Sequence, residues 1–351
     1  MFGANWFQKL FLHSSSSSLP TDASPSQSSD IEFEPATAAD ISLFDNLTGI
    51  VPIYKYGEHN WRLKYDTCPQ GFIKIVYCDR PSGLRTPVGL AVHNFISRAL
   101  TWGHVVVIDP RYRGTGVIVD LFAYSARMNE AYKNSNVVGD WRRDIPWERL
   151  NGMGNCLTEF RRFTIGGKLN PASDKWSKRS RASVVVDYPL RMMPDLAEGD
   201  SKTLSAILEY DLELYSDVLD AEDIKRTDFI KRWAFHPEYS RCAAAFDNDN
   251  TICGYGVLRR YAGDEWRLTP IYGDTAHIAY DIMMSLAQTL PQGTPLICVY
   301  PEFAAPATFE ACSQMGLKVL DGSERIRINS QRAVTELPYY KMFAKAEFWP
   351  M

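Results

Sequence analysis

The stretch that decides the fold is His104-Val-Val-Val-Ile-Asp-Pro-Arg-Tyr-Arg-Gly-Thr-Gly116. An apolar run of β type stops at Pro110, a loop with two arginines and two glycines follows, and good helix formers begin at Val117. Glycines let backbone N–H groups approach a ligand closely, and a helix N-terminus favours negative charge. Arg111 and Arg113 would add charge-assisted hydrogen bonds. The stretch therefore predicts a strand, an anion-binding loop and a helix, in this order.

The common phosphate-binding motifs do not match this loop. Both G-x-x-x-x-G-K-S/T and G-x-G-x-x-G are absent from it. The alternative is an ordinary basic turn. The strand before the loop and the helix after it favour phosphate binding.

Outward from the loop, the residue pattern predicts an alternating chain of strands and helices. In the first half we expect strands at 31–34, 72–78, 88–97, 104–110, 136–140 and 156–165, and helices that begin at Thr37, Val117 and Pro146. In the second half we expect strands at 183–187, 241–247, 251–260, 265–270, 295–300 and 318–328, and helices at 204–218, 224–235, 275–290 and 306–315. Because the order repeats, the sequence indicates a duplication.

Length and charge divide the chain. A length of 351 residues favours two domains. Seven basic residues lie between Arg161 and Arg181, whereas ten acidic residues lie in 195–223. We predict a disordered tail (1–30), a first domain (31–169), a basic linker (170–182) and a second domain (183–351).

Composition excludes several classes of protein. Hydrophobic residues make up 45% and charged residues 23%, as in globular proteins. The net charge of −4 argues against nucleic acid as a partner, and no apolar run reaches the roughly 18 residues of a membrane span. The seven cysteines are widely spaced and form no C-x-x-C pair, which predicts reduced thiols and no metal site. The tail has Lys9 as its one basic residue before residue 31, which favours a cytoplasmic location over a mitochondrial presequence.

Arg111-x-x-Gly114-x-Gly116 resembles the Q/R-x-x-G-x-G/A loop with which GNAT N-acetyltransferases bind the diphosphate of acetyl-coenzyme A. The second half is similar to the C-terminal domain of a two-domain GNAT subgroup found in bacteria and nematodes. The residues that carry this second resemblance are Tyr210-Asp211, Arg226 with Phe229 and Trp233, Gly254-Tyr255-Gly256-Val257 with Arg259, and Pro270-Ile-Tyr-Gly-Asp274. The resemblance implies an α/β class with a mixed α+β sheet, built as tandem GNAT folds.

The activity that the resemblance implies is acetyl transfer from acetyl-coenzyme A to an amine of a small molecule or a peptide, without a metal. The second domain would shape the acceptor site. Backbone N–H groups of the strand before the loop would act as an oxyanion hole. By the same resemblance, the pantetheine is lined by Val106, Val107 and Ile108, and the diphosphate is held by Arg111, Tyr112, Arg113, Gly114, Thr115 and Gly116.

The acid and the base of this reaction are less clear. Many relatives carry a tyrosine after the fifth strand, whereas this chain has Trp147 there, so the acid is unassigned. His104 is a candidate base because of its intrinsic pKa, and a structural histidine is the alternative. Glu58, His59 and Asp66 lie where acceptors bind in the family, and a solvated loop explains them equally well.

The second half lacks the arginine and glycine loop. We expect Asp274 to cap the following helix and to repel a diphosphate, so that this half binds no acetyl-coenzyme A. Asp211 lies on the apolar stripe of its helix. It either forms a buried pair with Arg226 or Arg259, or anchors a cationic acceptor. The rival to an enzyme is a regulatory module that binds coenzyme A or another ligand without turnover.

Overall fold

A computed structural model gives the structure of the chain. It describes residues 30–48, 55–95, 100–112, 117, 120, 121, 124, 127, 136–142, 155–170, 190–193, 201–214, 225–330 and 342–344. Several predictions fall outside these residues: the tail up to residue 29, most of the linker, the strand at 183–187, the helix at Pro146, and Arg113 to Gly116.

The first half follows the predicted order, with one added helix. Its elements are β1 (Ile31–Pro35), η2 (Ala38–Asp40), α2 (Ile41–Thr48), α3 (Glu58–Thr67), η4 (Pro69–Gly71), β2 (Phe72–Asp79), β3 (Leu84–Phe95), β4 (Leu100–Ile108), η5 (Pro110–Tyr112), β5 (Asn136–Arg142) and β6 (Asn155–Lys168). The predicted antiparallel meander is confirmed by the pairing of β2 with β3 and of β3 with β4. Residues 117, 120, 121, 124 and 127 are helical, and Val117 and Leu121 are buried, as predicted for the helix after the loop.

The second half repeats this order. Its elements are β7 (Leu190–Met193), α6 (Ser201–Leu214), α7 (Lys225–Ala234), β8 (Ser240–Phe246), β9 (Ile252–Arg260), η8 (Ala262–Asp264), β10 (Trp266–Gly273), α8 (Ala276–Ala287), β11 (Pro295–Pro301), η9 (Glu302–Ala304), α9 (Ala305–Gln314), β12 (Lys318–Ser330) and β13 (Met342–Ala344). Strand β13 was not predicted. The mixed α/β class is confirmed, because antiparallel meanders and parallel pairs lie in the same sheet.

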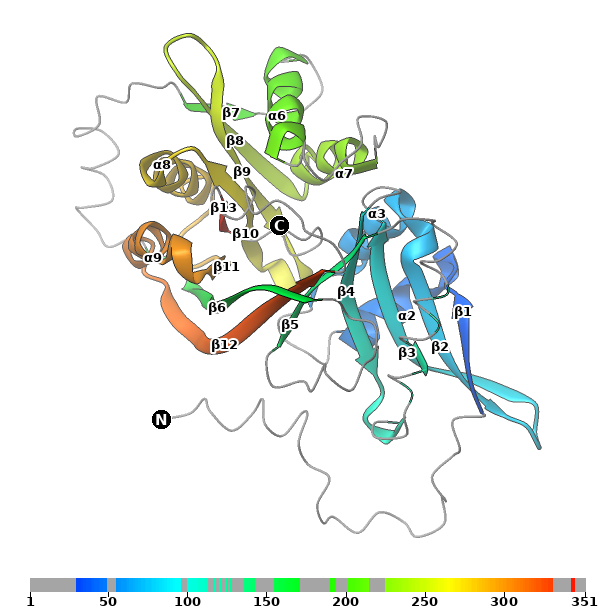
Figure 1. The fold of residues 1–351 in the computed structure, drawn as a ribbon. Helices are drawn as coiled ribbons and strands as arrows, with labels where there is room; N and C mark the ends of the chain where they lie inside the picture. The colour runs from blue at the N-terminus through cyan, green and yellow to red at the C-terminus, as the bar shows by residue number, and fades with distance from the viewer. Residues whose placement is uncertain are drawn as a thin grey trace.

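The two halves exchange strands. β12 of the second half lies between β5 and β6 of the first half, and β6 lies between β12 and β11. The described strands therefore form one continuous sheet, in which β6 and β12 bridge the halves (Figure 1). Each half completes its sheet with a strand of the other.

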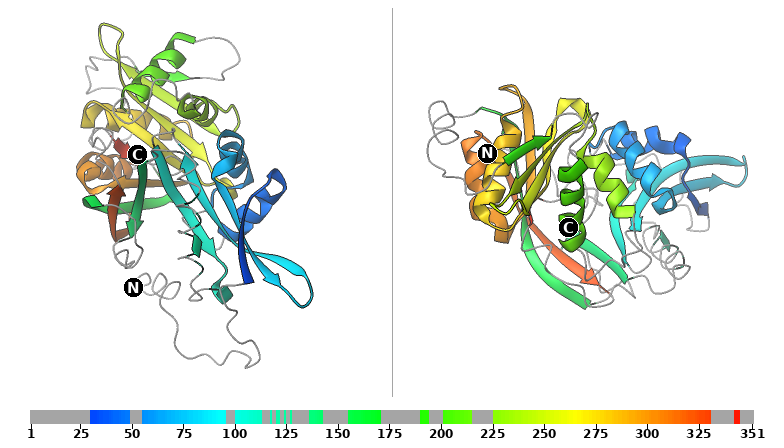
Figure 2. Two further views of the ribbon diagram at one scale, coloured as in Figure 1. Left: turned by 45° about the vertical axis from the view of Figure 1, so that its right-hand side comes forward. Right: turned by 90° about the horizontal axis from the view of Figure 1, so that it is seen from above.

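One hydrophobic core lies between the half-sheets. Helices α2 and α3 from the first half and α6 and α7 from the second half bury their apolar faces in it. Among its members are Phe44, Trp61, Phe229, Trp233 and Tyr255. Helices α8 and α9 cover the other face of the second half's sheet. Helix α3 consequently contacts α7, and Figure 2 shows the blue and green helices packed side by side.

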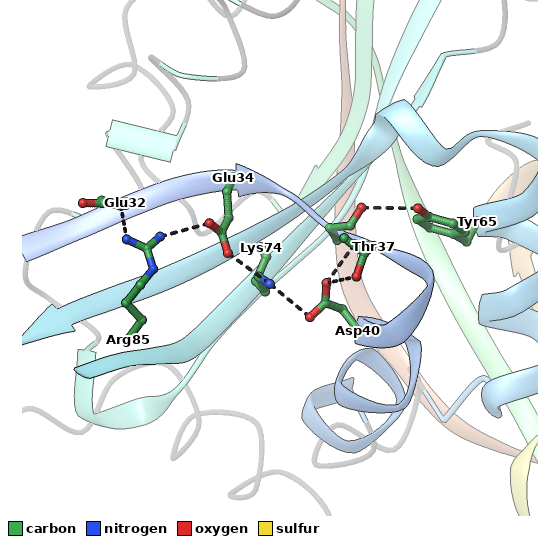
Figure 3. Close-up of polar contacts among 8 residues, drawn as sticks. Glu32, Glu34, Thr37, Asp40, Tyr65, Lys74 and Arg85 are labelled. Carbon is green, nitrogen blue, oxygen red and sulfur yellow. Dashed lines mark hydrogen bonds and ion pairs between the residues drawn. The ribbon is translucent and has the colours of Figure 1, made fainter. Parts of the chain in front are cut away.

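A small polar network holds the start of the first half, where β1 leads into η2 (Figure 3). Asp40 accepts hydrogen bonds from the N–H and the hydroxyl group of Thr37, both at 2.8 Å, as a capping box predicts. Lys74 on β2 pairs with Asp40 at 3.1 Å and with Glu34 at 3.0 Å. Burial opposes ionisation of Asp40, but these bonds outweigh it and lower the pKa of the carboxyl group. The helix start is thereby tied to both β1 and β2.

Candidate active site

The candidate site begins where β4 and β5 separate. The two strands pair in parallel from Leu100 and Asn136 to Gly103 and Gly139, and the pairing stops there although both strands continue. Beyond this point, β5 pairs with β12 on its other side. From His104 onwards, the edge of β4 that faces away from β3 therefore has no pairing with β5.

A β-bulge lies in β4 at the same place. Val92 pairs with Val105 and His93 pairs with Gly103, so His104 is an extra residue on β4. Bulges redirect the strand and are frequent next to active sites. The predicted base His104 thus lies at the point where the two strands separate, and its side chain is outside the described residues.

The direction of the β4 amides follows from one hydrogen bond. Asp109 N–H donates to the Val88 carbonyl at 2.8 Å, so this amide points to β3. Successive amides of a strand point to opposite sides, and the pairing from Val105 to Ile108 is regular. The N–H groups of Val106 and Ile108 therefore point toward the side where β5 has separated.

The side chains of this segment divide between the two faces of the sheet. Val106 and Ile108 are half-buried against the helix that contains Val117, whereas Val107 is buried in the core with α2 and α3. Of the three residues predicted to line a pantetheine, Val106 and Ile108 thus present backbone N–H groups to that side. Val107 supports them from the core.

Arg111 begins the loop. Its guanidinium is exposed and pairs with Asp109 at 2.7 Å, and its backbone N–H donates to the same carboxylate at 3.0 Å. This pairing raises the pKa of Arg111. Water screens this exposed ion pair, so a diphosphate could replace Asp109 as the partner of Arg111.

Helix α3 replaces the loop that was the alternative explanation for Glu58, His59 and Asp66. Glu58 and Asp66 are exposed. His59 instead contacts the second half: its Nε2 lies 2.9 Å from the Arg260 carbonyl oxygen and its ring stacks on Tyr239 at 4.0 Å. Burial lowers the pKa of His59. A solvated loop is therefore wrong for this segment.

Arg259 links α3 to the second half, a contact that the sequence pattern does not predict. Its Nε donates to Oδ1 of Asn60 at 2.9 Å, and its Nη1 donates to the Trp233 carbonyl at 2.8 Å. The guanidinium also lies over the Trp233 ring, 4.6 Å from the centroid. Burial lowers the pKa of Arg259 to about 9. Arg259 thus joins Asn60 of the first half to Trp233 and Ser240 of the second half, and Asp211 is not among its hydrogen-bond partners.

Asp211 is buried in α6, with 1% of its surface exposed. Its Oδ1 accepts a hydrogen bond from the Tyr255 hydroxyl at 2.5 Å. The side chain of Arg226, the other predicted partner, lies outside the described residues. Burial of this extent favours the structural alternative over direct contact with an acceptor.

The corresponding helix start in the second half is capped by Thr275. Its hydroxyl oxygen accepts from the Ile278 N–H at 3.3 Å, so the prediction that Asp274 caps this helix is wrong. The Asp274 carboxylate accepts from the Tyr210 hydroxyl at 2.9 Å instead. Thr275 is the N-cap because it directly precedes the first helical residue, and its short side chain reaches the Ile278 N–H group.

No group of three or more His, Cys, Asp or Glu side chains is placed to hold a metal ion among the described residues. None of the helices that the structure describes is long and apolar enough to cross a membrane.

Comparison with known proteins gives a family match for part of the chain and a shared fold for nearly all of it. Residues 218–336 match the family model described as an acetyltransferase (GNAT) domain. No curated protein matches the sequence.

Solved structures with the same fold cover nearly the whole chain. A putative acetyltransferase from Pyrococcus horikoshii has a TM-score of 0.59 at 12% identity, over 92% of this chain and 96% of its own. A GCN5-related N-acetyltransferase from Sphaerobacter thermophilus has a TM-score of 0.56 at 12% identity, over 92% and 98%. A tandem GNAT protein from the clavulanic acid biosynthesis pathway has a TM-score of 0.54 at 12% identity, over 86% and 98%.

The family match lies on the second half, whereas the arginine and glycine loop lies on the first. The shared fold spans both. The resemblance to GNAT acetyltransferases is therefore confirmed, by the family model for residues 218–336 and by the tandem GNAT fold for the chain as a whole.

Proposed function

We propose that the chain is an N-acetyltransferase that transfers the acetyl group of acetyl-coenzyme A to an amine. The donor site lies on β4 in the first half, and the second half shapes the acceptor site. The observation that carries the proposal is the separation of β4 from β5 at the His104 bulge, directly before the loop of Arg111 to Gly116.

The residues present fit acetyl-coenzyme A. Its pantetheine arm is extended and carries amide groups, which suit a strand edge with outward N–H groups such as those of Val106 and Ile108. Arg111 is exposed at the start of the loop, where a diphosphate needs a cation. When bound, acetyl-coenzyme A supplies an acetyl group activated as a thioester.

The chain itself would contribute orientation and charge stabilisation. The Val106 N–H group is the leading candidate for the oxyanion donor, because its direction is fixed by the β3–β4 pairing before any ligand binds. His104 is our candidate for the base that takes a proton from the amine, since the bulge places it where the strands separate.

The second half would act on the acceptor. Contacts of His59 and Asn60 with Arg259 and Arg260 hold α3 against β9 of the second half. The ten acidic residues in 195–223 would attract a cationic amine. We retain Asp211 as a proposed acceptor residue that acts at most indirectly. The predicted cytoplasmic location stays a prediction.

The test combines binding and turnover. We expect acetyl-coenzyme A to raise the melting temperature, because at 100 times Kd a ligand that binds only the folded state adds about 2.7 kcal/mol to the free energy of unfolding. Release of coenzyme A with a panel of amines, checked by mass spectrometry of the acetylated product, reports turnover. A stabilised protein that acetylates none of the amines would favour the regulatory module.

The variant Arg113→Glu/Gly114→Asp serves as the control for the site. It places negative charge in the loop and should abolish the stabilisation by acetyl-coenzyme A. A shift of unchanged size would place the ligand elsewhere on the chain.

A further inference from the structure

Strand β13 lies in the second half at the place that corresponds to the donor site of the first. Strand β10 pairs in parallel with β11 only from Trp266 to Leu268, and past this point β13 pairs with β10 instead. The register partners are Ile271 with Ala344 and Tyr272 with Met342. Figure 1 shows β13 in dark red beside β10. The two halves thus share a separation between parallel strands, and in the second half a third strand lies in it.

The two separations are related in detail. The pairing of β9 with β10 shifts between Leu268 and Ile271, which leaves one extra residue on β10, as His104 is extra on β4. In both halves the bulge lies where the parallel pairing ends. Asp274 N–H donates to the Cys253 carbonyl as Asp109 N–H donates to that of Val88, so the β10 edge at Ile271 and Gly273 is the counterpart of the β4 edge at Val106 and Ile108.

With β13 in place, this edge is buried. Ile271 and Tyr272 are fully buried, and Tyr300 on β11 is 1% exposed. Unpaired backbone N–H and C=O groups in such surroundings cost free energy comparable to lost hydrogen bonds. Strand β13 pairs with β10 and also contacts β11, α9 and η9. It thus satisfies an edge that water does not reach.

The segment of the second half that corresponds to the arginine and glycine loop differs from it in charge. The segment from Ile271 to Thr275 contains no arginine or lysine. Thr275 and Asp274 use their side-chain oxygens at the start of α8, toward Ile278 N–H and the Tyr210 hydroxyl. The first half places Arg111 and Arg113 at the same point.

We propose that the groove between β10 and β11 is a binding site for an extended peptide, and that its occupant is the chain's own segment 342–344. Main-chain pairing with a sheet edge is a common mode of peptide recognition. The inference rests on the proposed function, which places the acyl-donor site on β4. With the β10 edge taken by residues 342–344, the β4 edge is the single proposed donor site. The C-terminal segment stands in the second half where the pantetheine arm would lie in the first.

Hydrogen exchange of the full chain, read by mass spectrometry, tests this. We expect the amides of 342–344 to exchange at least about tenfold more slowly than in the urea-unfolded chain. Saturating acetyl-coenzyme A should slow exchange at 105–108 and leave 342–344 unchanged. Exchange of 342–344 at the unfolded rate, or faster exchange there on adding acetyl-coenzyme A, would overturn the proposal. Protection of 342–344 with no response to acetyl-coenzyme A anywhere would support the peptide groove and contradict the proposed function.

A disulfide gives a second test. Ile271→Cys with Ala344→Cys places two thiols at a register pair, within reach of a cross-strand bond. Oxidation should lock β13 in place and change the Kd for acetyl-coenzyme A by less than about twofold, with the reduced protein and Ala344→Cys alone as controls. Failure to form the disulfide, or a more than about tenfold loss of affinity on oxidation, would contradict the assignment.

Discussion

The imidazole of His93 is buried opposite Gly103, next to the bulge of β4, with 6% of the residue exposed. Burial lowers the pKa of His93 to about 4, against about 6.5 in the unfolded chain. The histidine is therefore neutral in the folded protein at pH 7. This neutral side chain is part of the packing next to the strand that carries the proposed donor site.

A pH dependence follows from this shift. Between about pH 6.5 and 4 the unfolded state binds more protons than the folded state, so the free energy of unfolding falls as the pH is lowered. At about 1.4 kcal/mol per unit of pKa, the loss attributable to His93 reaches about 3 kcal/mol near pH 4. In urea unfolding at pH 4 to 7, the free energy of unfolding of His93→Gln should change less with pH than that of the unmodified protein. The exposed His277, changed to Gln, should leave this dependence on pH as it is.

Asp211 and Tyr255 allow the structural and acceptor roles to be separated. Asp211→Asn weakens a buried hydrogen bond, so we expect a loss of about 1–3 kcal/mol in the free energy of unfolding. A double-mutant cycle with Tyr255→Phe should show coupling between the two side chains. We expect kcat/KM for the amine to change little. Normal stability with a large loss of kcat/KM would instead make Asp211 the anchor of the acceptor.

At the scale of elements, α3 is held to the second half by polar contacts inside the shared core. Asn60 is fully buried and accepts from Arg259. Asn60→Ala leaves this guanidinium N–H without its partner, and we expect a loss of about 2 kcal/mol. Arg62→Ala on the same helix removes an exposed pair with Glu58 at 3.7 Å and should cost less than about 0.5 kcal/mol. Equal effects of the two changes, measured by urea unfolding, would show that α3 does not depend on Arg259.

Helix α3 also shows why part of the fold was missed. Its buried residues are Asn60, Trp61, Leu63 and Lys64, so half of the buried set is polar. An apolar period cannot reveal such a helix, because it detects only apolar faces. The β2–β4 meander and the second-half helices were predicted correctly, since most of their buried residues are apolar and turn residues separate them.

The site was predictable only as residue types along the chain. The order of strand, arginines, glycines and helix was visible in the sequence, and it placed Val106, Ile108 and Arg111 near one another. The bulge at His104 was not visible, because it depends on the register of Val92 and His93 across the neighbouring strand. The amide directions that make Val106 a donor depend on the same register. Strand β13 is three residues long and carries no period that a pattern could detect.

For the whole molecule, the strand exchange makes the halves interdependent. β12 pairs with both β5 and β6, so neither half-sheet is complete without the other. The sequence could not show this, since β6 and β12 would have the same pattern paired within their own halves. The shared core of α2, α3, α6 and α7 adds to the coupling.

We therefore expect the chain to unfold in a single transition. In scanning calorimetry, the ratio of calorimetric to van't Hoff enthalpy should be close to one. Ile328→Pro, which disrupts pairing of β12 with Asp140 on β5 and Thr158 on β6, should shift this one transition to lower temperature without splitting it. Two resolved transitions, in either protein, would show that the halves fold independently.

The position of β12 late in the sequence also determines when the sheet can be completed during biosynthesis. A ribosome completes residues 155–168 long before residues 318–330, and nascent domains generally fold as they emerge. Here the first half leaves the exit tunnel with the edges of β5 and β6 lacking the strand that belongs between them. Until residues 318–330 are made, the nascent chain thus exposes two sheet edges, which are the usual templates for association with other chains. Maturation of the proposed donor half therefore waits for the synthesis of β12.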